Sequence, residues 1–295
     1  MDLTPYTQRA DVLIEALPYI RQFFGKTVVI KYGGHAMIDD ALRHAFARDI
    51  VLLKYVGMHP IVVHGGGPQI GETMKRMGLT ARFVDGLRVT DAATMDVVEM
   101  VLGGKLNKEI VATINLHGGQ AVGLSGKDAN LLVATKKRLY RQETPDAPPT
   151  PVDLGQVGDI TAVNSTVIEV LEANGFIPVI APTAVGTQGE SYNVNADTAA
   201  GDIAAALRAE KLLFLTDVPG ILDRDGKLLS SLNTAALEAL KAEGVLDGGM
   251  LPKVEACLHA LRHGVAKAHI IDGRVPHAVL LELFTDRGIG TEIVR

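Results

Sequence analysis

The chain has 295 residues, of which 47% are hydrophobic and 21% charged, and it carries one cysteine. This composition excludes an intrinsically disordered chain and a disulfide scaffold. The net charge of −5, the polar start MDLTPYTQRAD and the lack of a long apolar run indicate a cytoplasmic protein that binds neither nucleic acid nor membrane.

The first predicted element is an amphipathic helix over residues 4–24. Thr4 followed by Pro5 is a typical helix start, Gly25 is a typical stop, and Pro18 predicts a kink. Its apolar face is formed by Val12, Leu13, Ala16, Leu17, Ile20, Phe23 and Phe24. Such a helix either packs on its own domain or reaches another subunit, and the pattern leaves both open.

Short β-branched runs then alternate with helical stretches. Strands are predicted at residues 26–31, 60–64, 176–181, 212–216 and 269–272, and helices at 39–56, 197–208 and 252–263. This alternation requires right-handed crossovers and therefore predicts a mainly parallel sheet covered on both faces.

One loop stands out at residues 141–151, which hold four prolines and no apolar period. It is either a domain linker or a surface excursion. We place the functional boundary later, which divides the chain into an N-terminal helix (1–25), a first half (26–182) and a second half (183–295).

Three glycine clusters carry the main functional signal, and each is expected to follow a strand: residues 31–34 (KYGG), 64–68 (HGGGP) and 247–253 (DGGMLPK). Glycine at the end of a parallel strand brings backbone N–H groups close to an anion. A single Gly-Gly pair is more often an ordinary turn, but three clusters, two of them with a lysine, favour anion binding. The P-loop and dinucleotide motifs are absent.

Two lysines lie where the local structure disfavours a positive charge, and such exceptions are expected at functional sites. Lys31 ends an apolar strand, and Lys253 lies in the first turn of a helix, where the dipole disfavours a cation. Both lysines could instead reach solvent. Asp197 in the segment NVNAD is either ordinary capping chemistry or the counter-charge of the two lysines, and Arg88 in GLRVT is a candidate carboxylate clamp. His and Cys spacing gives no metal site, and Cys257 is predicted to be a core residue.

Taken together, KYGGHAM, HGGGPQIG, GLRVT, NVNAD and DGGMLPK resemble the acetylglutamate kinase branch of the amino acid kinase family. The resemblance runs from Lys31 to Lys253. It implies an α/β fold, a three-layer αβα sandwich around a mainly parallel, roughly eight-stranded sheet, with an extra N-terminal helix. The first half would bind the amino acid and the second half ATP. The implied reaction is the phosphorylation of N-acetyl-L-glutamate to N-acetyl-L-glutamyl 5-phosphate, the second step of arginine biosynthesis.

The resemblance also assigns roles to residues. Lys31 and Lys253 match the lysines that stabilise the transition state, and Asp197 matches the carboxylate that orients them. Gly66, Gly67, Arg88 and Asn193 match the acetylglutamate contacts, and Gly33 and Gly34 match the loop near the transferred phosphoryl group. His35 departs from the Asn of many relatives. No metal is held by the protein, since Mg²⁺ arrives with ATP.

The N-terminal helix resembles that of the arginine-inhibited hexamers, in which this helix interlaces dimers into a trimer of dimers. By that resemblance Tyr19, Lys211, Glu282 and Gly288 would surround arginine. A PII-type signalling protein is a further possible partner. Two other functions stay open: a kinase for acetylaminoadipate or another small carboxylate, and a catalytically silent arginine sensor.

Overall fold

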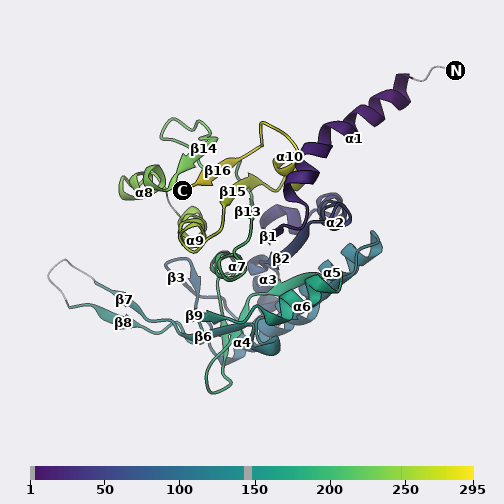
Figure 1. The fold of residues 1–295 in the computed structure, drawn as a ribbon. Coiled ribbons are helices and arrows are strands. Elements are labelled where there is room, and N and C mark those ends of the chain that lie inside the picture. The colour runs from purple at the N-terminus through teal and green to yellow at the C-terminus, as the bar shows by residue number, and fades with distance from the viewer. Residues whose placement is uncertain (1–3, 143–147, 247) are drawn as a thin grey trace.

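The computed structural model describes residues 4–142, 148–246 and 248–295. Helices and strands alternate along most of the chain (Figure 1). The helical segments are α1 (Thr4–Phe23), η1 (Gly34–Met37), α2 (Asp40–Tyr55), α3 (Gly67–Arg76), α4 (Ala92–Glu99), η2 (Met100–Leu106), α5 (Asn107–Leu116), η3 (Asp128–Asn130), α6 (Thr166–Ala173), α7 (Ala196–Ala206), α8 (Thr234–Ala242), α9 (Met250–Arg262) and α10 (Ala278–Leu283).

Sixteen strands are described, and they form one large sheet and three small ones. The strands are β1 (Thr27–Tyr32), β2 (His59–His64), β3 (Phe83–Val84), β4 (Leu87–Arg88), β5 (Ala121–Ser125), β6 (Leu132–Lys136), β7 (Leu139–Arg141), β8 (Thr150–Val152), β9 (Gly158–Val163), β10 (Ile177–Ala181), β11 (Thr183–Val185), β12 (Ser191–Asn193), β13 (Lys211–Thr216), β14 (Ser231–Asn233), β15 (Lys267–Asp272) and β16 (Thr291–Val294).

The large sheet has eight strands in the order β14-β16-β15-β13-β1-β2-β10-β5. Within it, the described pairings are parallel except for β15 with β16. The predicted eight-stranded, mainly parallel sheet is therefore confirmed. Strand β1 lies at its centre and pairs with β2 from the first half and β13 from the second. Pairing on both sides joins the two predicted halves through a single sheet.

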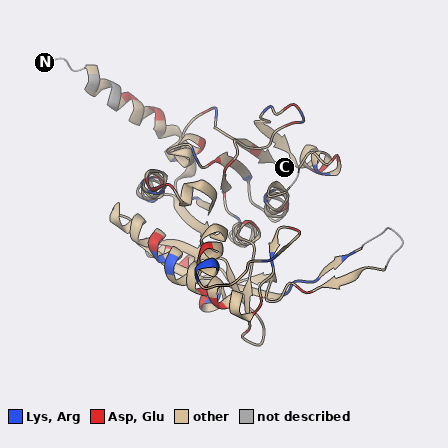
Figure 2. Cartoon of the chain, turned by 180° about the vertical axis from the view of Figure 1, so that it is seen from behind, with Lys and Arg blue, Asp and Glu red and all other residues tan. Residues whose placement is uncertain are grey.

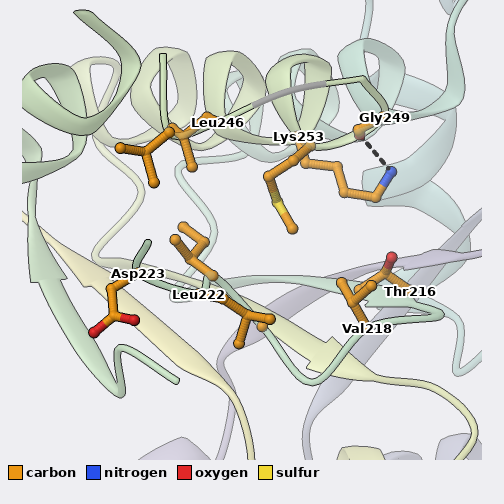
Figure 3. A pocket seen from close by; sticks show the side chains of 11 residues that line it. Thr216, Val218, Leu222, Asp223, Leu246, Gly249 and Lys253 are labelled. Atoms are coloured by element: carbon orange, nitrogen blue, oxygen red, sulfur yellow. Dashed lines mark hydrogen bonds between the residues drawn. The ribbon is translucent and has the colours of Figure 1, made fainter. Parts of the chain in front are cut away.

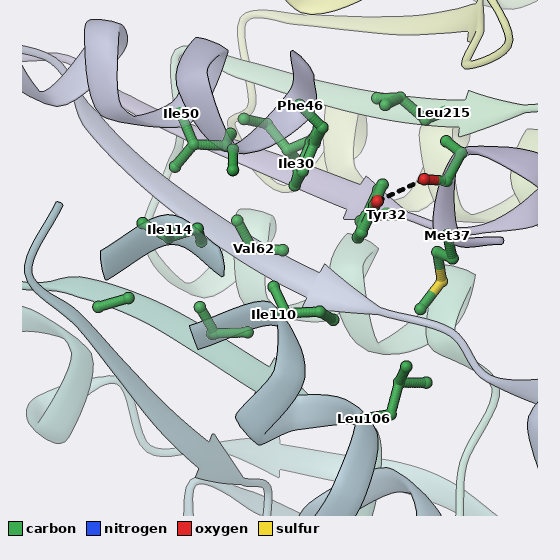
Figure 4. Close-up of a cluster of buried hydrophobic side chains, with 14 of the residues drawn as sticks. Ile30, Tyr32, Met37, Phe46, Ile50, Val62, Leu106, Ile110, Ile114 and Leu215 are labelled. Atoms are coloured by element: carbon green, nitrogen blue, oxygen red, sulfur yellow. Dashed lines mark hydrogen bonds between the residues drawn. The ribbon is translucent and has the colours of Figure 1, made fainter. Parts of the chain in front are cut away.

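Side-chain alternation along β1 divides the interior into two cores, one on each face of the sheet. Val28, Ile30 and Tyr32 enter the core that lies against α2, α5 and α10, where the Tyr32 ring stacks on Phe46 at 3.8 Å (Figure 4). Val29 enters the opposite core, against α7 and α9. Lys31 shares this second face, so the strand period itself directs its ammonium toward α7 and α9.

A smaller sheet, β12-β11-β6-β9, was not predicted. Its strands β11 and β12 follow the predicted boundary at residue 182 and pair with each other, and β11 also pairs with β6, which in turn pairs with β9. Strand pairing therefore crosses that boundary. The prediction of a plain loop at residues 141–151 was wrong at both ends. Arg141 and residues 150–151 belong to the antiparallel ribbon β7–β8, which projects from the body of the molecule (Figure 1).

Helix α1 also projects from the body (Figure 1). Phe23 is buried, but Val12, Leu13, Ile14 and Leu17 keep 46–72% of their surface exposed. The apolar side chains in the middle of α1 are therefore not covered by any other part of the described chain. Basic and acidic residues are interspersed over the helices seen from behind (Figure 2). Within the described ranges, no helix combines the length and apolarity that a membrane crossing requires.

Candidate active site

Two lysines and an aspartate meet at the carboxyl end of β1. The Lys31 ammonium lies 3.1 Å from Oδ1 of Asp197, and the Lys253 ammonium donates a hydrogen bond of 2.8 Å to Oδ2. The three side chains keep only 8–13% of their surface exposed. They come from β1, α7 and α9, so the structure brings together the three predicted catalytic residues from distant parts of the sequence.

The local sequence explains how α7 presents this carboxylate. Asn195 is the N-cap of α7, and its side chain accepts hydrogen bonds from the backbone N–H groups of Asp197 and Thr198. Because Asn195 provides the cap, the Asp197 carboxylate is available to pair with the two lysines. The sequence left Asp197 open between capping chemistry and the counter-charge of the lysines. In the structure Asn195 is the cap and Asp197 pairs with both lysines.

Asp197 is held as a carboxylate. Burial pushes its pKa upward, but the ion pairs with Lys31 and Lys253 outweigh burial and hold the pKa below its usual value. One anion thus fixes two cations in a site shielded from water. The arrangement places positive charge in position before any ligand arrives, and it leaves Asp197 unsuited to accept a proton.

The loop after β1 contains Gly33 and Gly34. A side chain at Gly33 would collide with the Lys31 ammonium, and one at Gly34 would collide with the Asp217 carboxylate. Gly34 also has φ of +71°, which favours glycine. Oδ1 of Asp217 accepts a hydrogen bond of 2.7 Å from the backbone N–H of His35. Sequence reasoning missed Asp217, although its position directly after the apolar strand β13 was a usable signal.

A first cavity, of about 200 Å³, lies between the two predicted substrate segments. Its lining includes Gly66, Gly67, Arg88 and Asn193, so the structure gathers the four predicted substrate residues around one space. The Arg88 guanidinium donates to the Gly67 carbonyl at 2.9 Å and lies 4.7 Å from the centre of the Phe83 ring.

Two buried polar residues support the glycine loop at this cavity. The fully buried His64 ring donates from Nδ1 to the Gly65 carbonyl at 2.8 Å, and Nε2 lies 3.2 Å from the Asn107 amide nitrogen. Burial lowers the pKa of His64 to about 4, so its ring is neutral. Asn107 also bonds the Val179 carbonyl at 2.9 Å. Asn107 directly follows η2, a π-helical segment in which Leu102 lines the cavity.

A second cavity, of about 390 Å³, lies on the other side of Lys253. Thr216, Val218 and Leu222 approach it from the end of β13 and the loop beyond, while Leu246 and Lys253 approach from the opposite side (Figure 3). Lys253 also donates to the Gly249 carbonyl at 3.3 Å. The lining is mostly apolar, which suits a flat ring system. Lys253 lines this cavity and pairs with Asp197, whose neighbours Asn195 and Ala196 line the first cavity.

The expected position of the third glycine cluster was wrong. Gly248 and Gly249 lie between α8 and α9, so this cluster follows a helix and not a strand, while Asp247 lies outside the described residues. The sequence could not separate the two cases, because glycine pairs occur both in loops that connect two helices and in loops that follow a strand. Its lysine still reaches the site, because α9 packs directly on α7.

The four predicted effector residues lie away from these cavities, near the amino end of β13. Three of them form a buried cluster. Glu282 accepts from His269 at 2.6 Å and from the Ile289 backbone at 2.7 Å, and Lys211 lies 3.2 Å from the other nitrogen of His269. Gly288 lies next to the Glu282 carboxylate and has φ of +60°.

Tyr19 of α1 contacts the segment that follows Glu282 and makes no contact with the cluster among those described. It donates a hydrogen bond to Asp286 and packs edge-on against Phe284, with ring centroids 6.4 Å apart. Burial lowers the pKa of Lys211. Sequence reasoning did not name His269, whose ring connects Lys211 to Glu282. Over the described ranges, no group of three or more His, Cys, Asp or Glu side chains could hold a metal ion.

Comparisons with known proteins identify the family of this chain. The profile of the amino acid kinase family matches residues 26–272. The acetylglutamate kinase of Geotalea uraniireducens is 62% identical over 97% of this chain and 98% of its own length. That of Pelotomaculum thermopropionicum is 60% identical over 98% and 99%.

Solved structures show the same fold. N-acetylglutamate synthase from Neisseria gonorrhoeae, solved with coenzyme A and N-acetyl-glutamate, matches with a TM-score of 0.83 at 26% identity. The match covers 97% of this chain and 63% of that one. Carbamate kinase from Giardia lamblia matches with a TM-score of 0.65 at 17% identity over 92% of this chain and 98% of its own. The chain therefore belongs to the amino acid kinase family.

Proposed function

We propose that the protein transfers the γ-phosphoryl group of ATP to the side-chain carboxylate of N-acetyl-L-glutamate, giving N-acetyl-L-glutamyl 5-phosphate for arginine biosynthesis. The observation that carries the proposal is the Lys31–Asp197–Lys253 cluster, placed beside two cavities of different character. The relatives named acetylglutamate kinase, 56–62% identical, support the choice of substrate.

The two cavities divide the substrates between them. The cavity with Arg88 and Asn193 takes acetylglutamate, because a guanidinium binds a carboxylate in a fixed geometry and Gly66 and Gly67 line the same space. The apolar cavity beyond Lys253 takes the adenine nucleotide. On this proposal residues 26–182 supply most of the amino-acid site and residues 183–295 most of the ATP site.

The chemistry needs positioning and positive charge, and no general base. The acceptor carboxylate is ionised at neutral pH, because a free glutamate side chain has a pKa of about 4.3. One of its oxygens attacks the γ-phosphorus, the bond from that phosphorus to the bridging oxygen breaks, and ADP leaves with the electron pair. Lys31, Lys253 and the backbone N–H groups of the Gly33–Gly34 loop stabilise the charge on the transferred group. Mg²⁺ enters with ATP as its counter-ion.

Assembly and regulation complete the proposal. The uncovered apolar face of α1 supports a homo-oligomer, a dimer or trimer of dimers, in which this helix contacts another subunit. The cluster of Lys211, Glu282 and Gly288 beside Tyr19 supports an arginine site, with the Glu282 carboxylate as the partner of the guanidinium.

One assay tests the function. Purified protein is given MgATP with acetylglutamate, acetylaminoadipate or glutamate, each with and without arginine, and ADP release is measured. We expect turnover with acetylglutamate and its reduction by arginine. Faster turnover of acetylaminoadipate would reassign the substrate, and arginine binding without turnover of any substrate would identify a silent sensor.

A further inference from the structure

We propose that the hydroxyl group of Thr90 positions the acetylglutamate site by joining Arg88 to Asn193. This inference rests on the proposed function, since it concerns the same cavity. Thr90 is fully buried and is not part of the cavity lining, so it cannot touch the substrate. Its Oγ1 donates to the Arg88 carbonyl at 2.9 Å and accepts from the Asn193 amide at 3.1 Å.

The number of hydroxyl protons fixes the direction of these bonds. A threonine hydroxyl has one proton, and the Arg88 carbonyl can only accept, so that proton points to Arg88. Oγ1 must then receive a hydrogen from Asn193, which requires the amide nitrogen, and not the amide oxygen, to face Thr90. The hydroxyl therefore sets which way the Asn193 amide is turned in the cavity, and it anchors the backbone that carries the Arg88 guanidinium.

The backbones on both sides are held independently of this hydroxyl. The Thr90 N–H donates to the Leu154 carbonyl at 2.9 Å, the Gln156 N–H donates to the Thr90 carbonyl at 2.5 Å, and the Asn193 N–H donates to the Gln156 carbonyl at 2.8 Å. Residues 154–157 thus hold the main chain of Thr90 and Asn193 in place. Removing only the hydroxyl should leave the fold intact and release the Asn193 amide and the Arg88 carbonyl.

Thr90→Val tests this, because valine keeps the shape of threonine and lacks the hydroxyl. We expect the KM for acetylglutamate to rise about tenfold or more, since two part-buried polar groups lose their partner, while the KM for ATP stays within about twofold. Thr90→Ser restores the hydroxyl and should return the acetylglutamate KM to within about threefold of the parent value. If Thr90→Val proves insoluble, Thr90→Ala removes the same group without adding bulk and carries the same expectation.

Thr94→Val is the matched control. Thr94 is also buried, lies four residues after Thr90 in the first turn of α4, and its hydroxyl group bonds the Asp91 carboxylate and not the cavity residues. We expect Thr94→Val to affect the melting temperature and to leave the acetylglutamate KM unchanged. The proposal is overturned if Thr90→Val raises this KM no more than Thr94→Val does, if both substrate KM values rise together, or if Thr90→Ser is as impaired as Thr90→Val.

The parent protein separates this inference from the function on which it rests. If the parent does not phosphorylate acetylglutamate, the proposed function fails, and the variants are then compared by how far acetylglutamate raises their melting temperatures. Unequal stabilisation of parent and Thr90→Val would still support the role of Thr90, and equal stabilisation would overturn it. If the parent is active and Thr90→Val is equally active with an unchanged KM, only the role of Thr90 fails.

Discussion

At the scale of single residues, the site depends on charges that are paired before the substrates bind. Asp197 orients both lysines and keeps its negative charge because their attraction outweighs the effect of burial on its pKa. The spacing of the motifs and the family resemblance predicted these three residues together. The pattern left Asp197 open between capping and pairing with the lysines, and the family resemblance favoured pairing. The distances, and the fact that each lysine takes one oxygen of the carboxylate, come only from the structure, because Lys31, Asp197 and Lys253 lie on three separate elements.

The role proposed for Lys253 predicts a separation of kinetic constants. Lys253→Ala should lower kcat about 10²- to 10³-fold with little change in the acetylglutamate KM, because its charge acts mainly in the transition state. Steady-state ADP release measures both constants. Lys241→Ala is the control, since Lys241 pairs with Glu255 on the surface. An unchanged kcat with raised KM values for both substrates would contradict the assignment.

His64 predicts a loss of stability in acid. Its folded pKa is about 4, below the unfolded value near 6.5, so the unfolded chain binds the proton more tightly. The stabilising effect of the neutral ring is present above pH 6.5 and is lost as the pH falls toward 4, at a cost of about 3 kcal/mol in the free energy of unfolding.

Urea unfolding at several pH values measures this effect. His64→Gln should be less stable at neutral pH but should show a shallower decline in acid, because the titrating group is gone. His263→Gln, which changes an exposed histidine, should keep the decline of the parent protein. If His64→Gln and the parent lose stability in parallel, the acid effect does not come from His64.

At the scale of elements, the β-branched runs and helix caps predicted most of the large sheet. Asp39 caps α2, because its side chain accepts a hydrogen bond from the Leu42 backbone N–H. The sheet β12-β11-β6-β9 and the ribbon β7–β8 escaped prediction, because their short strands are defined by partners far away in the sequence. Local pattern carries no information about such partners.

Helix α1 yields a prediction about assembly. Removing residues 1–24 should reduce the size of the oligomer and abolish arginine inhibition, while turnover without arginine persists. Light scattering and ADP release with and without arginine measure these effects. Leu13→Asp, which leaves Tyr19 and Phe23 in place, should also reduce the size of the oligomer and weaken arginine inhibition. Glu15→Ala is the control and should change neither. An unchanged hexamer that arginine still inhibits after the deletion would refute the proposed role.

At the scale of the whole molecule, two cavities lie beside a single sheet whose central strand, β1, carries Lys31 next to its last residue, Tyr32. The proposed function places one substrate in each cavity, with the reacting groups near the carboxyl end of β1. Strand pairing runs from β5 to β14 without a break, so the two proposed halves share one scaffold. The family resemblance implies an amino-acid half and an ATP half, and this division stays a proposal, while the order of the strands in the sheet comes from the structure.

Because the cavities are separate, we expect that a substitution in one of them removes the stabilisation by its own ligand and leaves the stabilisation by the other ligand unchanged. Each ligand at 100 times its dissociation constant should raise the free energy of unfolding by about 2.7 kcal/mol. Arg88→Gln should abolish the shift in melting temperature caused by acetylglutamate and preserve the shift caused by ATP. Loss of both shifts in this variant would show that Arg88 supports the fold and not one cavity.

The single cysteine has a practical consequence for measuring motion. Cys257 is fully buried in α9, as predicted, and burial raises the pKa of its thiol, so it is a poor nucleophile in the folded state. Cysteines introduced on the surface of each half can therefore carry fluorescent dyes without removal of the native one. Energy transfer between two such dyes would report whether the halves approach each other during turnover.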